Sequence, residues 1–329
     1  MGELVKGMVE PLAKRWTAAM SGPLVLFWLA GALLVTHAHS GLSGICRRGS
    51  QGLAEPACRL MSQGAWGVVL AATAATAIII LCALGLSAVA SPLLEVLAGK
   101  WGTIPPLMAL ALRRTTCHAA RRKRLDAQAR DLSGPGNLVG DRLAVWQIQN
   151  AWQRTAARRM WSHYPRRRDE LRPTSVGNAL HGVAAGIDRN YGLSLPICWG
   201  PFVECLESTA RERLIASATR VLGRTQALVC AAAASVWAVA LPGALAPLCW
   251  LAGCALGIWG AYRSLRSGVE QYCDHVRAAF AVHRVRLYRA TGFAPPASTA
   301  EEVERGRLLT SALAMELTDD IAHTWPETL

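Results

Sequence analysis

The sequence predicts an all-α fold: a helical integral membrane protein with about four transmembrane helices, arranged as two pairs, and a helical cytoplasmic module. Of its 329 residues, 52% are hydrophobic and only 17% are charged, whereas soluble domains carry about a quarter charged residues. The apolar residues are gathered in blocks. No Asp, Glu, Lys or Arg occurs from Trp16 to Cys46, from Leu60 to Leu94 or from Thr225 to Tyr262. Each uncharged run can hold a bilayer-crossing helix, which needs about 20 apolar residues.

The first pair of spans is expected within residues 21–94. Ser21–Ala38 and Trp66–Ala90 have the length and composition of bilayer-crossing helices. Residues 1–20 then form a cytoplasmic N-terminus, and residues 39–65 form an outer loop.

The outer loop contains two of the ten cysteines, Cys46 and Cys58. If the loop faces an oxidising compartment, the two can close a disulfide. The alternative is a pair of free thiols. The other cysteines lie within spans or on the reducing side, where a free cysteine behaves as a small hydrophobe.

A second transmembrane hairpin is expected over residues 225–262. Pro242 and Pro247 interrupt the uncharged run near its middle, which favours two spans at about 225–241 and 244–262 joined by a tight turn. Both segments are short for full spans. A re-entrant or half-buried hairpin is therefore the alternative.

Basic residues flank all four predicted spans on one side, and the positive-inside rule assigns that side to the cytoplasm. The chain is thus predicted to be a multi-pass protein of the plasma membrane, with a cytoplasmic N-terminus and a cytoplasmic C-terminus. The flanking residues are Lys6, Lys14, Arg15, Arg113, Arg114, Arg121, Arg122, Lys123, Arg124, Arg220, Arg224, Arg263 and Arg266.

The cytoplasmic module is expected to consist of a basic helical region, 95–224, and C-terminal helices, 263–329. An apolar segment at 104–112 is too short to span the bilayer and continues as a basic helix over 113–132. A second helix is expected from Asp141, acting as its cap, to about His163.

Basic and tryptophan side chains are interleaved in the basic region. They are candidates for contact with a lipid bilayer that carries anionic headgroups, or with a protein partner. A solvated basic face with the tryptophans in a helical core is the alternative, and nucleic acid is not expected as a partner. The candidate contact residues are Arg121, Arg122, Lys123, Arg124, Trp146, Trp152, Trp161, Arg166, Arg167 and Arg168.

The most distinctive stretch follows these basic residues. Its marked residues are Pro173, Thr174, Gly177, Asn178, Tyr191, Gly192, Leu193 and Trp199. Together with the hairpin and the later helix Val276–Tyr288, this stretch resembles a family of actinobacterial multi-pass membrane proteins of unknown function, over about residues 165–292. The resemblance implies an architecture and no activity.

Helix capping and interfacial anchoring can also explain the residues of this stretch. Thr174 or Ser175, next to a proline, can start a helix, and Gly192 can end it in a left-handed cap. Trp199 and Phe202 are expected as anchors at the membrane interface.

Two helices are expected to run continuously between cytoplasm and bilayer, over 201–241 and 245–290. Ser298 and Glu301 form a predicted capping box for a last, acidic helix. Its charge is opposite to that of residues 113–168, which predicts a weak, salt-sensitive docking between the two.

Small residues in the second hairpin indicate close helix packing. Gly253 and Gly257 form a GxxxG pattern, which Gly260 extends. We expect this surface to pack within the hairpin, with a homo-oligomer as the alternative.

No constellation for catalysis is found. The phosphate-cradling, dinucleotide, zinc-protease and hydrolase motifs are missing. The pairs at Cys117-His118 and Cys273-x-His275 have no second pair at zinc spacing. We therefore expect no cofactor, no metal and no enzyme activity.

The predicted function is a plasma-membrane anchor or scaffold that presents a basic helical cytoplasmic module to a protein partner. The alternative is an oligomeric membrane channel or a membrane-disrupting effector. A membrane-bound enzyme of an unrecognised type is third.

Overall fold

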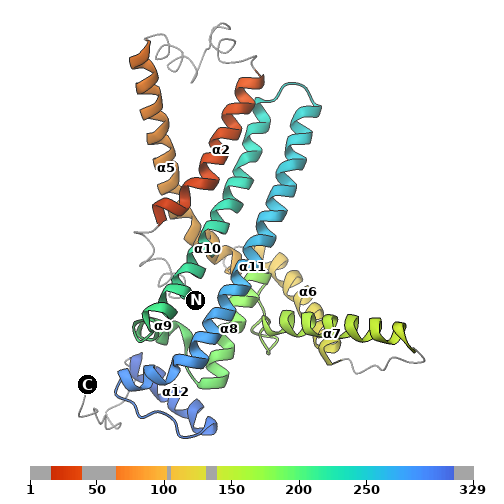
Figure 1. Cartoon of the computed structure of the whole chain (residues 1–329), viewed down its shortest axis with the longest axis vertical. Helices are drawn as coiled ribbons and strands as arrows, with labels where there is room; N and C mark the ends of the chain where they lie inside the picture. The colour runs from red at the N-terminus through yellow and green to blue at the C-terminus, as the bar shows by residue number, and fades with distance from the viewer. Residues whose placement is uncertain (1–15, 39–63, 102–104, 131–138, 315–329) are drawn as a thin grey trace. The chain divides into compact units, whose positions relative to one another are not determined.

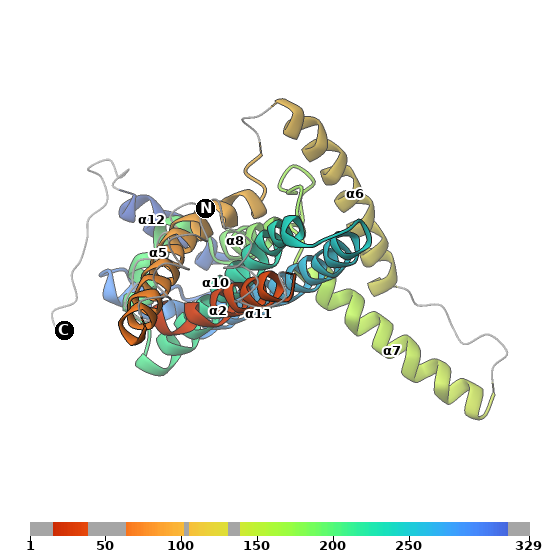
Figure 2. The same cartoon turned by 90° about the horizontal axis from the view of Figure 1, so that it is seen from above.

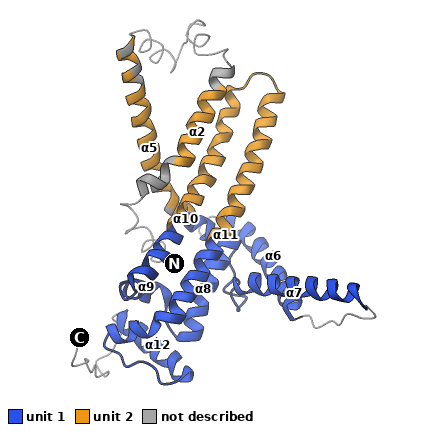
Figure 3. Ribbon diagram, in the orientation of Figure 1, with its two compact units in different colours: residues 1–10, 94–218, 269–329 blue, residues 11–93, 219–268 orange. Residues whose placement is uncertain are grey.

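The computed structural model describes residues 16–38, 64–101, 105–130 and 139–314 (Figure 1). Within these residues the protein is all-helical, with nine α-helices, one short 3-10 segment and no strand. The chain forms two compact units, coloured separately in Figure 3. Unit 1 comprises residues 1–10, 94–218 and 269–329, and unit 2 comprises residues 11–93 and 219–268.

Three helical segments are long and apolar enough to cross a membrane: Ala72–Leu97, Ser208–Ala240 and Leu245–Ala290. A fourth apolar segment, Gly22–Leu34, is shorter. The structure therefore supports a multi-pass membrane protein with three helices of spanning length, and the four-span topology stays a prediction.

Unit 2 contains α2 (Trp16–Ala38), most of α5 (Ala65–Leu97), and those parts of α10 (Ser208–Ala233) and α11 (Leu245–Ala290) that fall within residues 219–268. Helix α2 packs on the 3-10 segment η2 (Ala234–Ala240) through aromatic rings. The Trp237 ring lies 5.5 Å from Phe27 and 5.9 Å from Trp28, centroid to centroid. These contacts form one aromatic cluster on apolar helices.

Helix α11 (Leu245–Ala290) confirms the prediction of one continuous helix. It contributes residues to both units. Gly292, with φ +78°, follows its end in the left-handed conformation that glycine tolerates best.

The predicted continuous helix over 201–241 is wrong. Helix α9 (Leu195–Glu204) ends before α10 (Ser208–Ala233) begins. The Arg211 guanidinium donates hydrogen bonds to the carbonyl oxygens of Val203 (3.1 Å) and Glu204 (2.7 Å). An arginine from the next helix thus satisfies carbonyls that a continuing helix would have bonded.

Unit 1 is built from α6 (Pro105–Arg130), α7 (Asp141–Ser162), α8 (Ser175–Tyr191), α9, α12 (Thr299–Leu313) and the adjoining parts of α10 and α11. Helices α6 and α7 pack together through their C-terminal halves, and the first half of α7 extends beyond α6 (Figures 1 and 2). Their shared core contains Leu125, Ala129, Ala157, Tyr164 and Leu171.

Two details at the helix ends differ from prediction. Asp141 is the first residue of α7 rather than its cap, and the capping position is Gly140, with φ +60°. At α12, Ser298 accepts a hydrogen bond from the Glu301 amide as predicted, but the Glu301 carboxylate accepts from the Ala297 amide. Helix α12 packs on α8 and α9, its principal neighbours, instead of the basic region.

Candidate functional site

The distinctive Pro-Thr-x-x-Gly-Asn stretch forms the start of α8. The Thr174 hydroxyl caps the helix by accepting from the Gly177 amide at 2.8 Å, and it donates to the Leu97 carbonyl. The fully buried Asn178 carboxamide accepts from the Arg172 amide at 2.9 Å and donates to the Arg172 and Thr174 carbonyls at 2.8 Å each. The hydrogen bonds of these polar groups all go to backbone groups of the protein, so their role is structural.

Glycines in the same stretch allow close backbone approaches. A Cβ at Gly177 would overlap the Ala98 carbonyl, and a Cβ at Gly192 would overlap the Val303 carbonyl. Gly192 also adopts φ +69° at the end of α8, which confirms the predicted left-handed cap. The end of α8 therefore meets the backbone of α12 directly.

Of the remaining marked residues, Leu193 and Trp199 lie in the interior of unit 1 and Tyr191 is half-buried. Leu193 is fully buried, Trp199 is 6% exposed, and the Phe202 ring stacks on Phe280 with centroids 3.8 Å apart. The expectation that Trp199 and Phe202 anchor the membrane interface was wrong, because both lie in a protein core. The Arg284 guanidinium lies 4.6 Å from the centre of the Tyr191 ring.

Arg284 also pairs with Glu302, which is buried in α12. A buried carboxylate needs such a partner, because removing a charge from water is costly. The ion pair therefore joins α11 to α12 within unit 1.

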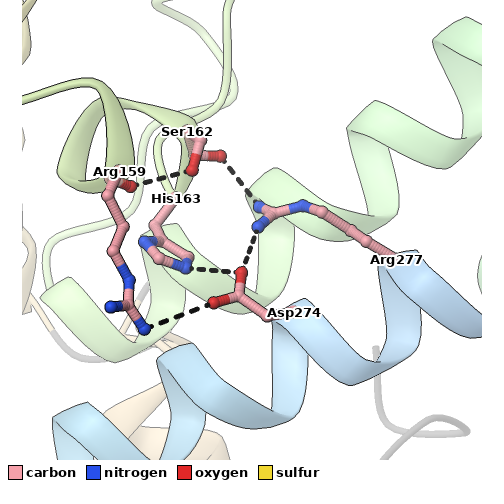
Figure 4. A network of polar contacts seen from close by, with 5 residues as sticks. All are labelled: Arg159, Ser162, His163, Asp274 and Arg277. Carbon is pink, nitrogen blue, oxygen red and sulfur yellow. Dashed lines mark hydrogen bonds and ion pairs between the residues drawn. The ribbon is translucent and has the colours of Figure 1, made fainter. Parts of the chain in front are cut away.

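A polar network fixes the end of α7 to α11 (Figure 4). Asp274 accepts from His163 Nε2 at 3.0 Å and from Arg277 at 2.9 Å, and Arg159 lies 3.8 Å away. Arg277 also donates to the Ser162 carbonyl at 2.8 Å. One carboxylate thus holds three cationic or titratable side chains from two helices.

This network lacks the geometry of a catalytic triad. The Ser162 hydroxyl donates to the Arg159 carbonyl at 2.8 Å, and His163 donates to or accepts from Asp274 alone among the described residues. A nucleophile needs a hydrogen bond to its base, and Ser162 makes none to His163. The network is an inter-helix clamp.

The described part of the chain contains no site arranged for thiol catalysis or for metal binding. Burial raises the pKa of the Cys198 thiol and of the Cys205 thiol, so neither is an activated thiolate at neutral pH. No group of three or more metal-ligating side chains occurs among the described residues. In the Cys117-His118 pair, His118 Nδ1 lies 3.0 Å from the Tyr164 hydroxyl, so this histidine has a structural partner.

The positive charge of the chain is concentrated on the α6–α7 pair and the turn after it. Residues 113–168 carry fourteen Arg and Lys residues and three Asp, a net charge of +11 out of +13 for the whole chain. Several of these cations are exposed and have no carboxylate partner among the described residues. They are Arg113, Arg114, Arg121, Lys123, Arg124, Arg142, Arg158, Arg166 and Arg168.

Apolar side chains are exposed on the same two helices. Val145, Ile148 and Trp152 follow a spacing of three and four residues, so they share one face of α7, and Trp152 is 77% exposed. The apolar start of α6 exposes Met108 and Leu112 immediately before its first two arginines. A helix that is basic and also apolar on an outward face is typical of contact with a membrane surface.

The predicted tryptophans are divided between two roles. Trp152 faces outward, whereas Trp161 is half-buried against the α6–α7 core, where the Arg166 guanidinium lies 5.8 Å from its ring. Trp146 is half-buried. Arg122 is also half-buried and donates to the Pro165 carbonyl at 3.1 Å. The other predicted basic residues are exposed, and Arg167 forms ion pairs with Asp169 and Glu170.

The predicted glycine surface of α11 is not packed within the hairpin. No described atom lies within 4 Å of a Cβ built at Gly253, Gly257 or Gly260. The preference for internal packing was wrong, and the face is left open. Cys46 and Cys58 lie outside the described residues.

Sequence reasoning missed Asp274 and the Val145–Ile148–Trp152 face. The role of Asp274 could not be found because two of its three partners, Arg159 and His163, lie more than 100 residues away in the chain. The spacing of three and four residues is present in the sequence, but which face of α7 stays uncovered depends on how the helix packs in the folded chain.

Comparison with models of known protein families, with curated proteins and with solved structures finds no match to the chain. The resemblance over residues 165–292 stays a prediction.

Proposed function

We propose that this protein is a multi-pass membrane anchor whose unit 1 is a basic helical module on the cytoplasmic side. In this proposal four spans cross the bacterial plasma membrane. The α6–α7 pair lies on the anionic leaflet, and the rest of unit 1 is presented to a protein partner.

The spans support the anchoring role. Three helices have spanning length, and the basic residues that flank them favour a cytoplasmic unit 1. We assign the fourth span to α2. Its described apolar segment, Gly22–Leu34, covers about two thirds of a bilayer at 1.5 Å per residue, and the complete helix of 23 residues is long enough.

One observation carries the proposed membrane contact: exposed cations and exposed apolar side chains occur together on α6 and α7. In this proposal Val145, Ile148 and Trp152 enter the boundary between headgroups and acyl chains, and arginines beside them contact phosphates. A nucleic acid would engage the cations through its phosphates and would at most stack a base on Trp152, so Val145 and Ile148 would stay exposed. The membrane therefore accounts for both features.

The contact can be tested by hydrogen–deuterium exchange of the full-length protein in nanodiscs. We expect α6 and α7 to exchange more slowly in nanodiscs containing anionic phospholipid than in purely zwitterionic ones. The triple variant Arg114→Gln, Arg121→Gln, Arg124→Gln should lose this difference, because each cation near an anionic surface contributes about 1 kcal/mol. The wild-type difference should also shrink at high salt.

The matched control removes three exposed arginines of unit 1 that lie outside α6 and α7: Arg213→Gln, Arg289→Gln, Arg307→Gln. It changes the net charge equally and should keep the slower exchange. Equal loss in both variants, or a wild type insensitive to lipid charge, would refute the proposed contact.

An oligomeric channel is the second candidate, and the open glycine face of α11 favours it. Gly253 and Gly257 could admit a second copy of the helix closely. A single-channel current in reconstituted bilayers, abolished by Gly257→Leu, would support the channel over the anchor.

A further inference from the structure

A hollow of about 420 Å³ lies between α6 and the segment that follows α7. Its lining combines cations with small and apolar side chains and a single carboxylate. The lining residues are Thr116, Ala119, Ala120, Arg122, Lys123, Asp126, Arg168 and Leu171.

The cations that line this hollow, called the groove below, are placed to bind an anion. Arg122 is oriented by its 3.1 Å hydrogen bond to the Pro165 carbonyl, which uses one of its five N–H groups. Lys123 and Arg168 are exposed and have no carboxylate partner among the described residues. Three cations from two chain segments thus line the same hollow.

The carboxylate in the lining does not cancel this charge. Asp126 accepts a hydrogen bond from Arg130 at 2.9 Å, an ion pair one helical turn apart. The groove therefore keeps an excess of positive charge. Exposed pairs of this kind contribute little to stability, so a bound anion would not have to break a strong interaction.

Most of the other residues that line the groove are small or apolar. Leu171 is buried, and Ala119 packs against the same α6–α7 core. The Thr116 hydroxyl donates to the Arg113 carbonyl at 2.7 Å and can only accept from a ligand. The lining fits a group that combines a compact anion with a neutral, partly apolar part.

We propose that this groove binds the phosphate of an anionic phospholipid headgroup. Guanidinium groups match phosphate through paired N–H donors, and an ammonium adds a compact charge. The inference rests on the proposed membrane contact of α6 and α7 and deepens it, because it assigns one specific headgroup site within a broad basic surface.

The test uses full-length protein in detergent and measures binding of short-chain phosphatidic acid, with short-chain phosphatidylcholine and inorganic phosphate as comparison ligands. The double variant Lys123→Gln, Arg168→Gln should weaken phosphatidic acid binding about tenfold, since two charge-assisted contacts are lost. Arg122 is kept because it bonds to the Pro165 carbonyl. The control, Arg213→Gln, Arg289→Gln, removes two exposed cations of unit 1 that lie outside α6 and α7 and do not line the groove, and it should change affinity less than about twofold.

Equal weakening in the two variants would overturn the site, because attraction would then come from net charge. Equal affinity for phosphatidylcholine would overturn it as well. Inorganic phosphate that competes at the same concentration would overturn the lipid as the source of the phosphate. If the groove variant still shows slow exchange of α7 in anionic nanodiscs but unchanged phosphatidic acid affinity, this inference fails while the membrane contact stands.

Discussion

Single small or polar residues determine how the helices of unit 1 meet. Gly192 and Gly306 let the backbones of α8 and α12 touch, since a Cβ at Gly306 would overlap the Tyr191 carbonyl. Asn178 satisfies backbone groups of the turn before α8, and any shorter or apolar side chain would leave them unpaired in the interior. The residues that stand out in the sequence thus serve packing.

Substituting Gly192 by alanine should destabilise unit 1. Its φ of +69° is unfavourable for alanine, and the added Cβ would overlap a backbone oxygen, so we expect a loss of about 1–3 kcal/mol. Thermal unfolding of the protein in detergent, followed by tryptophan fluorescence, measures the loss. Gly186→Ala is the control, because no described atom lies near its Cβ, and it should leave the melting temperature unchanged or slightly raised.

The stability of unit 1 should also fall in mild acid. Burial, followed by the charge of Arg172, holds the pKa of His181 below its ordinary value of 6.5, while Glu170 acts weakly in the opposite direction. The unfolded chain therefore binds a proton that the folded chain resists, so this contribution is complete above pH 6.5 and is lost as the pH falls through the folded pKa. His181→Gln should reduce the dependence of the melting temperature on pH below 6.5. If the dependence of the melting temperature on pH were unchanged in this variant, groups other than His181 would determine it.

At the level of elements, the ends of helices were predictable where one residue type determines them. The Thr174 cap, the Gly192 termination and the length of α11 follow from local sequence. The break between α9 and α10 was not predictable, because neither proline nor glycine occurs there. It depends on the Arg211 guanidinium, whose bonds to two carbonyls form only when the chain turns.

The attachment of α7 to α11 should depend on Asp274. Asp274→Asn removes the charge that faces His163, Arg159 and Arg277, and we expect faster amide exchange in the last turn of α7, corresponding to about 1–2 kcal/mol. Asp188→Asn, an exposed residue of α8, is the control and should leave α7 unaffected. Unchanged exchange in Asp274→Asn would show that apolar contacts alone hold α7.

At the scale of the whole molecule, composition and the placement of charges along the sequence predicted the helical class and a multi-pass membrane protein. Uncharged runs and their basic flanks carry that information directly. The α7 apolar face and the groove beside Lys123 needed the structure, because they depend on which side of a helix is left uncovered. That the face at Gly257 is left open also became clear only from the structure, because it too depends on which side of a helix is uncovered.

The number and direction of the spans are tested most directly by topology reporters at three places: before Met1, within the outer loop at Gly52, and after Leu329. Four spans predict cytoplasmic signals at both termini and an external signal at Gly52. If α2 did not cross the membrane, the N-terminal reporter would lie on the same side as Gly52, and the four-span anchor would be contradicted. A cytoplasmic signal at Gly52 would contradict the orientation that places the basic module on the inner leaflet.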